Sequence, residues 1–302
     1  MPDGWIILDK PLGLGSTQAV AAVRRMCRAA GFGKVKVGHG GTLDPLATGV
    51  LPIALGEATK LCGRMLDASK RYAFTIAFGA ETDSLDREGE VIARCEHLPG
   101  ADALRDVLVR FTGPIAQVPP AHSAIRIAGT RAYDRARAGE TVAMPARGVT
   151  VHALALDPAG DGPLAGAGFI AHVSKGTYIR SLARDIARAA GSLGHVAALR
   201  RLAAGPFTLD AAISLDKLEE AAKGAGFAQA ILPLEAGLVD IPALTLDPEA
   251  ARAVRQGRKL SGLPHDDGLY WAKSGTVPIA LVELSGRCLS VVRGFNLTDV
   301  AE

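Results

Sequence analysis

The segment 38–49, "GHGGTLDPLATG", carries the residues of this 302-residue chain whose types and spacing could do chemistry. Its glycines let the backbone take positive φ angles and approach a ligand closely. Pro45 fixes its own φ and drives Asp44 toward an extended conformation, so we expect Asp44 on a shaped loop. His39 precedes it by five residues. Asp44 is therefore either a reacting carboxylate or a turn residue that binds its own backbone.

Two further segments combine basic and aromatic side chains. They are "KRYAF" at 70–74 and "SKGTYIRSLARD" at 174–185. Basic side chains contact phosphates, and aromatic rings stack on unpaired bases. Each residue also has an ordinary interpretation: Tyr72 alternates with core residues of a strand, Tyr178 packs a helix start, and Arg180 is a surface charge. Spacing alone does not choose between these interpretations.

The sequence lacks the residue spacings of metal sites, phosphate loops and serine hydrolases. The seven histidines include no HxxxH pair, and the four cysteines, Cys27, Cys62, Cys95 and Cys288, include no CxxC pair, so we predict no metal site. The glycine-rich stretch 31–42 departs from the phosphate loop GxxxxGK[ST], and no GxSxG serine elbow is present. Scattered cysteines are typical of free thiols in a reducing cytosol.

The elements that must position these residues mix strands and helices. Ser16 and Ser214 are the expected N-caps of two of the helices. Apolar periodicity and turn residues predict strands at 4–10, 71–79, 89–94, 148–156 and 168–174, helices at 17–30, 101–111, 130–139, 179–191 and 215–223, and a short strand or turn at 197–202.

The pattern changes beyond Pro242. A basic helix over 248–260 precedes two apolar segments at 277–295, which is typical of a small strand-rich module. We therefore predict two domains, 1–245 and 246–302. The fold class is α+β, a mixed and mainly antiparallel sheet with flanking helices.

Composition fits a globular protein, with 48% hydrophobic and 22% charged residues. No membrane span or secretory signal is evident, so we expect a cytoplasmic protein. The net charge is only +3, but it is unevenly distributed. Residues 1–40 carry six Lys/Arg against two Asp, 172–201 carry six against one, and 81–106 are acidic. One basic face and one acidic face are expected, although the charges could also simply solvate the surface.

Six segments, taken together and in order, resemble the TruB family of bacterial tRNA pseudouridine synthases. The resemblance covers about residues 4 to 240. The segments are "GWIILDKPLGLGST", "GHGGTLDPLATGVLPIALGEATKL", "KRYAFTIAFGAETDSLDREGEV", "PPAHSAIRIAGTRAYDRARAGE", "SKGTYIRSLARDI" and "LRRLAAGPF". The resemblance implies a pseudouridine synthase fold with a C-terminal PUA-like RNA-binding module. It implies isomerisation of uridine 55 in the T loop of tRNA, with base flipping and without cofactor or metal.

The resemblance also implies roles for six residues. Asp44 takes the place of the catalytic aspartate, and Arg180 is its partner. Tyr72 matches the ring that stacks on the flipped base and is suited to moving the C5 proton. The further substrate-binding positions match His39, which wedges into the T loop, and Tyr178 and Leu199, which wall the site. Lys10 and Pro11 match an early motif that we take to be architectural.

Two positions depart from the family pattern. Gly40 stands where many members carry threonine, and His122 stands where an aromatic residue is usual. We expect the module after residue 245 to touch the tRNA acceptor stem, and the chain to act as a monomer without an obligate protein partner. Two alternatives stay open: a noncatalytic tRNA chaperone, and a glycosidase that uses Asp44 as nucleophile. The glycosidase normally needs a second carboxylate, and the matching motifs supply no well-placed one.

Overall fold

The computed structural model describes residues 2–123, 126–127, 130–131, 144–157, 164–224 and 226–297. The chain forms two compact units. The first comprises residues 1–45, 50–66 and 205–302, and the second comprises residues 46–49 and 67–204. The helix predicted over 130–139 lies outside the described residues, apart from a two-residue strand at its start.

The sheet of the first unit is built on two apolar strands, β1 (Gly4–Lys10) and β3 (Ala47–Leu55). Almost every side chain of β1 is buried, as expected for a central strand. The strand order is β14-β1-β3, with β15 on β1 and β2 on β3. The additional strands are β2 (Val37–His39), β14 (Ile213–Ser214) and β15 (Leu232–Pro233).

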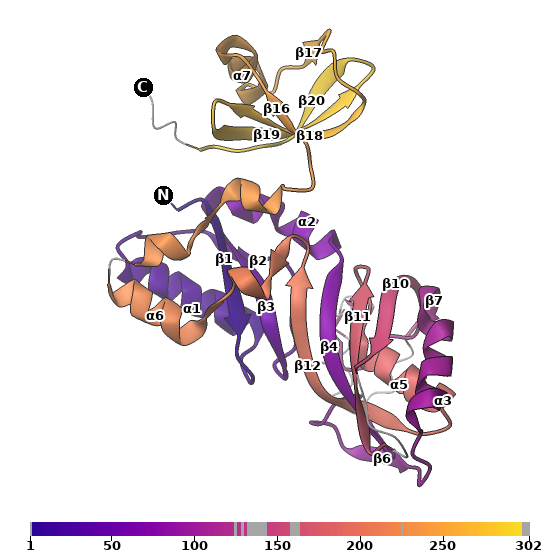
Figure 1. Cartoon of the computed structure of the whole chain (residues 1–302). Coiled ribbons are helices and arrows are strands. Elements are labelled where there is room, and N and C mark those ends of the chain that lie inside the picture. Colours follow the sequence, from indigo (N-terminus) through magenta and orange to yellow (C-terminus); the bar gives the residue numbers. More distant parts are fainter. Residues whose placement is uncertain are drawn as a thin grey trace. The chain divides into compact units, whose positions relative to one another are not determined.

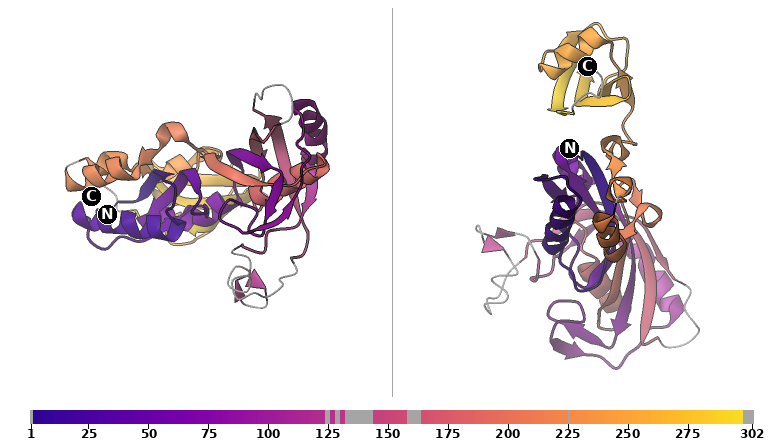
Figure 2. Two further views of the ribbon diagram at one scale, coloured as in Figure 1. Left: turned by 90° about the horizontal axis from the view of Figure 1, so that it is seen from below. Right: turned by 90° about the vertical axis from the view of Figure 1, so that its left-hand side faces the viewer.

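Helices α1 (Ser16–Ala29) and α6 (Leu215–Lys223) lie side by side and pack on this sheet (Figures 1 and 2). The apolar face predicted for α1 is buried. Ser214 caps α6 as predicted, since its hydroxyl accepts from the Lys217 N–H. The predicted cap of α1 is wrong: Gly15 holds that position, and its N–H donates to Oε1 of Gln18 at 2.8 Å.

The sheet of the second unit has the order β12-β4-β11-β10-β7, and every one of these pairings is antiparallel. Residues 47–49 of β3 add a parallel edge to β12. The short strand predicted at 197–202 is the middle of the eleven-residue β12. The strands are β4 (Lys70–Phe78), β7 (Gly113–Gln117), β10 (Arg147–Leu156), β11 (Gly166–Val173) and β12 (Gly194–Ala204).

Helices α3 (Ala101–Leu108) and α5 (Ile179–Ala189) cover one face of this second sheet (Figure 1). Their apolar sides and the inward side chains of the strands form one hydrophobic core. Two hairpins complete the unit: β5 (Ala80–Thr82) with β6 (Val91–Arg94), and β8 (Arg126–Ile127) with β9 (Thr130–Arg131).

The C-terminal residues build a separate five-stranded sheet in the order β16-β18-β19-β20-β17. Helix α7 (Pro248–Arg255) packs on it and is capped by Asp247. This sheet and α7 enclose an apolar core of their own, so the predicted strand-rich module is confirmed. Its first strand begins at Ala243. The strands are β16 (Ala243–Thr245), β17 (Leu260–Ser261), β18 (Gly268–Ser274), β19 (Val277–Ser285) and β20 (Cys288–Gly294).

The α+β class with a mainly antiparallel sheet is therefore confirmed. Within the described residues, no helix has the length and apolar character that a membrane crossing requires. The remaining short elements are α2 (Cys62–Asp67), β13 (Phe207–Thr208) and 3-10 helices at Gly56–Leu61, Val109–Phe111, Leu209–Ala211, Phe227–Ala230 and Leu234–Gly237.

Candidate active site

Asp44 lies on a loop between β2 and β3, outside helix and strand, as the sequence predicts. Its side chain is half-buried. His39 closes β2, where it pairs with Ile53 of β3, and its Nδ1 accepts from the Gly41 N–H at 3.3 Å. The first unit thus holds His39 and Asp44 on one short segment.

Buried groups fix the residues on both sides of Asp44. The hydroxyl of Ser16 bonds to both main-chain polar groups of Leu43, at 2.8 Å each. The carbonyl of Pro45 accepts from the Gly13 N–H at 2.8 Å and from Nζ of Lys10 at 3.3 Å. Lys10 is fully buried, and its ammonium also donates to two nearby carbonyls. A loop tied down on both sides of a residue presents its side chain in one place.

Gly40, one of the two departures from the family pattern, is a packing requirement in this chain. A Cβ at position 40 would lie 2.6 Å from Cβ of Met65, a distance that real Cβ atoms essentially never show. The Gly40 N–H donates to the Pro52 carbonyl at 2.8 Å. The glycine therefore allows the loop to lie directly against Met65.

Tyr72 and Leu199 come from neighbouring strands of the second unit. Tyr72 on β4 pairs with Arg201 of β12, and Leu199 pairs with Phe74, so both side chains lie on the face that carries the core. Both are partly buried at the margin of that core. The other edge of β12 is lined by the start of β3, where Ala47 pairs with Leu199. Ala47 and Leu199 thus lie side by side within the second unit.

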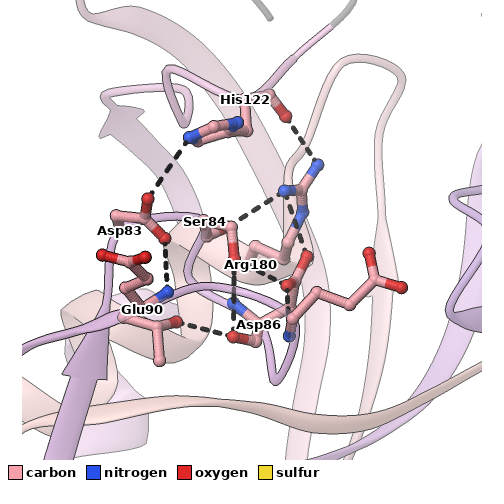
Figure 3. A network of polar contacts seen from close by, with 8 residues as sticks. Asp83, Ser84, Asp86, Glu90, His122 and Arg180 are labelled. Carbon is pink, nitrogen blue, oxygen red and sulfur yellow. Dashed lines mark hydrogen bonds and ion pairs between the residues drawn. The ribbon is translucent and has the colours of Figure 1, made fainter. Parts of the chain in front are cut away.

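Tyr178 and Arg180 come from the start of helix α5. Tyr178 holds the N-cap position in an extended conformation, and Arg180 lies in the first turn and is 7% exposed. Arg180 donates to the Ser84 carbonyl at 3.0 Å and to the His122 carbonyl at 2.9 Å. Its guanidinium also forms an ion pair of 3.3 Å with Asp86 (Figure 3).

Asp86 is a partner of Arg180 that its position in the sequence does not single out, because it is one of several acidic residues in 81–106. Its carboxylate accepts from the Ser84 hydroxyl at 2.6 Å, as well as from Arg180. Leu85, between Ser84 and Asp86, has a φ of 61°, which a non-glycine residue rarely adopts. This strained turn aims both the Ser84 carbonyl and the Asp86 carboxylate at Arg180 (Figure 3).

His122, the second departure from the family pattern, joins the same network. Its carbonyl accepts from Arg180, and its Nε2 lies 3.7 Å from Oδ2 of Asp83 (Figure 3). The main chain at this position therefore orders Arg180 whatever its side chain. The imidazole ring of His122 lies beside Asp83.

Each predicted site residue thus lies in an ordered setting. His39 and Asp44 belong to the first unit. Tyr72, Tyr178, Arg180 and Leu199 belong to the second, where two neighbouring strands bring Tyr72 and Leu199 together and one helix start holds Tyr178 and Arg180. The pairing of Arg180 with Asp44 stays a prediction.

Family models match most of the chain. The model described as the N-terminal domain of TruB family pseudouridylate synthase covers residues 25–179, and that of the tRNA pseudouridylate synthase B C-terminal domain covers 180–239. The chain belongs to the TruB family. It is therefore an enzyme, a pseudouridine synthase.

Full-length relatives agree with this membership. A protein named tRNA pseudouridine synthase B from Novosphingobium aromaticivorans is 68% identical, and 100% of both chains is covered. One from Zymomonas mobilis with the same name is 58% identical over 97% of this chain and 96% of its own. One from Rhodopseudomonas palustris is 45% identical over 98% of this chain and 82% of its own.

Solved structures confirm the predicted pseudouridine synthase fold. A chain in the crystal structure of a Cbf5-Nop10-Gar1 complex has a TM-score of 0.73 at 26% identity, over 97% of this chain and 85% of that one. A chain in an H/ACA RNP bound to a substrate RNA containing 2'-deoxyuridine has a TM-score of 0.71 at 25% identity, over 98% and 86%. The similarity to these solved chains thus extends over nearly the whole length of this chain.

Proposed function

We propose that this TruB-family enzyme isomerises uridine to pseudouridine at position 55 in the T loop of tRNA. The observation that carries the proposal is the anchored loop of Asp44. Ser16 and Lys10 fix the residues before and after Asp44, inside the motif in which the family carries its catalytic aspartate. A carboxylate fixed in this way is suited to act on one atom of a bound substrate.

The reaction exchanges one bond of the ribose for another. The N1–C1′ bond of uridine breaks and the uracil leaves as an anion. The base turns over, and a C5–C1′ bond forms. C5 then loses its proton while N1 gains one, so the product is an isomer of the substrate. Asp44 either attacks C1′ or assists removal of a sugar proton, and the residues are compatible with both routes. In the first route the bond between Asp44 and C1′ breaks as C5 attacks C1′. In the second route the proton taken from the sugar returns to it after the C5–C1′ bond forms.

The remaining residues take roles that suit their surroundings. Arg180 is the proposed partner of Asp44, since a guanidinium attracts a carboxylate. Tyr72, at the margin of the core, offers a ring for the extruded base and a hydroxyl for the C5 proton. Tyr178 and Leu199 wall the site, and His39 wedges into the T loop.

Extrusion of the nucleotide is the step that needs an aromatic surface. Flipping a base costs on the order of a few kcal/mol. Stacking on one ring returns about 1–3 kcal/mol per base. The Tyr72 ring and the His39 wedge thus offset the cost together. We propose that the enzyme acts in the cytoplasm as a monomer, with the C-terminal module, residues 246–302, contacting the acceptor stem.

The direct test is incubation of an unmodified tRNA transcript with the protein, followed by mapping of pseudouridine. We expect product at uridine 55 from the unaltered protein and from Asp216→Asn, an exposed carboxylate on α6. Asp44→Asn should bind tRNA but give no product. Product from Asp44→Asn would contradict the proposal. Tight binding without any product would favour the chaperone, and free uracil would favour the glycosidase.

A further inference from the structure

A buried glutamine binds the main chain of Tyr178 with both ends of its amide. Gln117, the last residue of β7, is 1% exposed. Its Nε2 donates to the Tyr178 carbonyl at 3.1 Å, and its Oε1 accepts from the Tyr178 N–H at 2.7 Å. One side chain thus satisfies both polar groups of one residue, as a neighbouring strand would.

This arrangement differs from the usual helix cap, because Gln117 bonds the main chain of the N-cap residue itself and not the N–H groups of the first turn. The N-cap position normally carries Ser, Thr, Asp or Asn, whose side-chain oxygen binds a free N–H of the first turn. Tyr178 holds that position in α5 and makes no such bond from its side chain. Burying a side-chain amide costs free energy unless its polar atoms are hydrogen-bonded. An apolar side chain would fill the space at position 117 without that cost, so the bonds to Tyr178 are the reason for glutamine there. Gln117 holds the main chain of the N-cap residue from outside the helix. The N-cap position can therefore carry the aromatic side chain of Tyr178.

A second side chain holds the ring itself. Arg147, the first residue of β10, is the register partner of Gln117. Its guanidinium carbon lies 4.8 Å from the centroid of the Tyr178 ring, within the range of a cation–π contact. Its NH2 group donates to the Gly176 carbonyl at 2.7 Å, in the turn just before Tyr178. Backbone and ring of Tyr178 are therefore held by two residues that face each other across β7 and β10.

The chain beyond Gln117 holds the next turn of the helix. The carbonyl of Val118 accepts from the Ser181 hydroxyl at 2.8 Å, and the carbonyl of His122 accepts from Arg180 at 2.9 Å. Gln117 is thus the first contact of a segment that follows the start of α5. A displacement at Gln117 would move Tyr178 and the first turn that carries Arg180.

We propose that Gln117 and Arg147 are positioning residues for pseudouridine formation, which hold Tyr178 against the substrate and Arg180 in the first turn of α5. This inference rests on the proposed function, in which Tyr178 walls the site and Arg180 partners Asp44. Neither Gln117 nor Arg147 reacts. Each acts through the residue that it holds.

Gln117→Glu provides the decisive test, because its protonation changes one bond. An ionised carboxylate only accepts, so it keeps the bond from the Tyr178 N–H but turns lone pairs toward the Tyr178 carbonyl. The protonated acid has one donor and one acceptor, and it restores both bonds. At pH 9 we expect the single-turnover rate at saturating tRNA to fall about tenfold or more. The rate should recover toward that of the unaltered protein as the pH is lowered to 5.5.

Gln229→Glu is the matched control, since Gln229 is exposed in the 3-10 helix Phe227–Ala230, outside the C-terminal module. Its rate should follow the pH profile of the unaltered protein. Gln117→Leu should lose rate at every pH, and Arg147→Lys, which keeps the charge but loses the planar group, should lose part of it. A role in positioning predicts that the tRNA dissociation constant changes less than the rate. If Gln117→Glu and Gln229→Glu have parallel pH profiles and Gln117→Leu keeps the rate of the unaltered protein, the proposal is overturned.

Hydrogen exchange separates this inference from the proposed function. The amides of 176–182 should exchange faster in Gln117→Leu than in the unaltered protein, and normal exchange together with a normal rate would overturn the inference. If Gln117→Leu does not fold, the acid recovery of Gln117→Glu still decides. If the unaltered protein forms no pseudouridine, the proposed function fails and the positioning role fails with it. Faster exchange would then show only that Gln117 holds the helix start.

Discussion

The hydroxyl of Ser16 bonds to both main-chain polar groups of Leu43, donating to the carbonyl and accepting from the N–H at 2.8 Å each. Ser16 is the first residue of α1 and is 5% exposed, and Leu43 immediately precedes Asp44. One buried side chain therefore connects the start of a helix to the candidate catalytic loop.

Ser16→Ala should destabilise the fold and lower the rate of pseudouridine formation. The substitution leaves the N–H and carbonyl of Leu43 without this partner, and a buried polar group that loses its bond costs about 1–3 kcal/mol. Urea unfolding measures the free energy, and single-turnover assays measure the rate. Ser285→Ala, at an exposed position of β19, should change stability by less than about 0.5 kcal/mol. Equal stability of the two variants would show that the Leu43 bonds contribute little.

The role of Ser16 illustrates what a sequence can and cannot predict. Apolar periodicity located α1 and its buried face, because a period of 3.6 residues is local information. The same polar residue before a helix is equally suited to cap it or to bind elsewhere, and its partner lies 27 residues away. Strand β12 was predicted too short, since Arg200 and Arg201 interrupt its apolar pattern although Arg201 is fully buried.

In the candidate site, too, local sequence patterns predict some residues, and others depend on partners far away in the sequence. The motif of 38–49 made Asp44 a candidate, because glycine frees the backbone there and proline restricts it. The resemblance to the TruB family, and not the spacing, favoured a catalytic carboxylate over a turn residue. The spacing of residues in the sequence does not single out Asp86 or Gln117. Their roles follow from contacts with α5, 94 and 61 residues further on. Such partners depend on the tertiary fold, which local patterns do not encode.

Gly49→Ala should strongly destabilise the junction of β3 and β12. Gly49 has a φ of 101° and pairs with Arg201, whose carbonyl oxygen would lie 2.2 Å from an added Cβ. Strain at such a backbone angle costs about 1–3 kcal/mol, and the contact with backbone adds to it. Urea unfolding should show a loss of at least about 2 kcal/mol.

Gly63→Ala is the control for this substitution. Gly63 lies in α2, and an added Cβ there would have no atom within 4 Å. Alanine favours a helix over glycine by about 1 kcal/mol, so this variant should be neutral or slightly more stable. A Gly49→Ala protein as stable as Gly63→Ala would contradict the close approach of β3 to β12.

Asp86→Asn should weaken both stability and activity through Arg180. The Asp86 and Arg180 side chains are 13% and 8% exposed, and removal of one charge from a buried ion pair costs on the order of 3 kcal/mol. The single-turnover rate should also fall, because Arg180 loses a group that orders it. Asp102→Asn removes the partner of Arg105 in a pair on α3 that is largely exposed, and it should cost about 0.5 kcal/mol or less. Similar losses for the two variants would contradict the importance of burial.

Lys70→Met should change how stability depends on pH in the alkaline range. Burial, with a further contribution from Arg201, lowers the pKa of Lys70 from its ordinary value of 10.5 to about 8. Below pH 8 both folded and unfolded chains hold the proton, so the full cost of the buried charge is present. Between pH 8 and 10.5 the unfolded chain binds more protons, and the stability of the native protein rises with pH.

The difference in unfolding free energy between the unaltered protein and Lys70→Met should therefore grow by about 3 kcal/mol from pH 8 to 10.5. Urea unfolding at constant ionic strength across this range measures it. Lys259→Met, which removes an exposed ammonium, is the matched control. If the Lys70→Met curve runs parallel to that of the unaltered protein, the Lys70 ammonium is hydrated in the folded chain. Its place at the start of β4, two residues before Tyr72, would then be open to solvent.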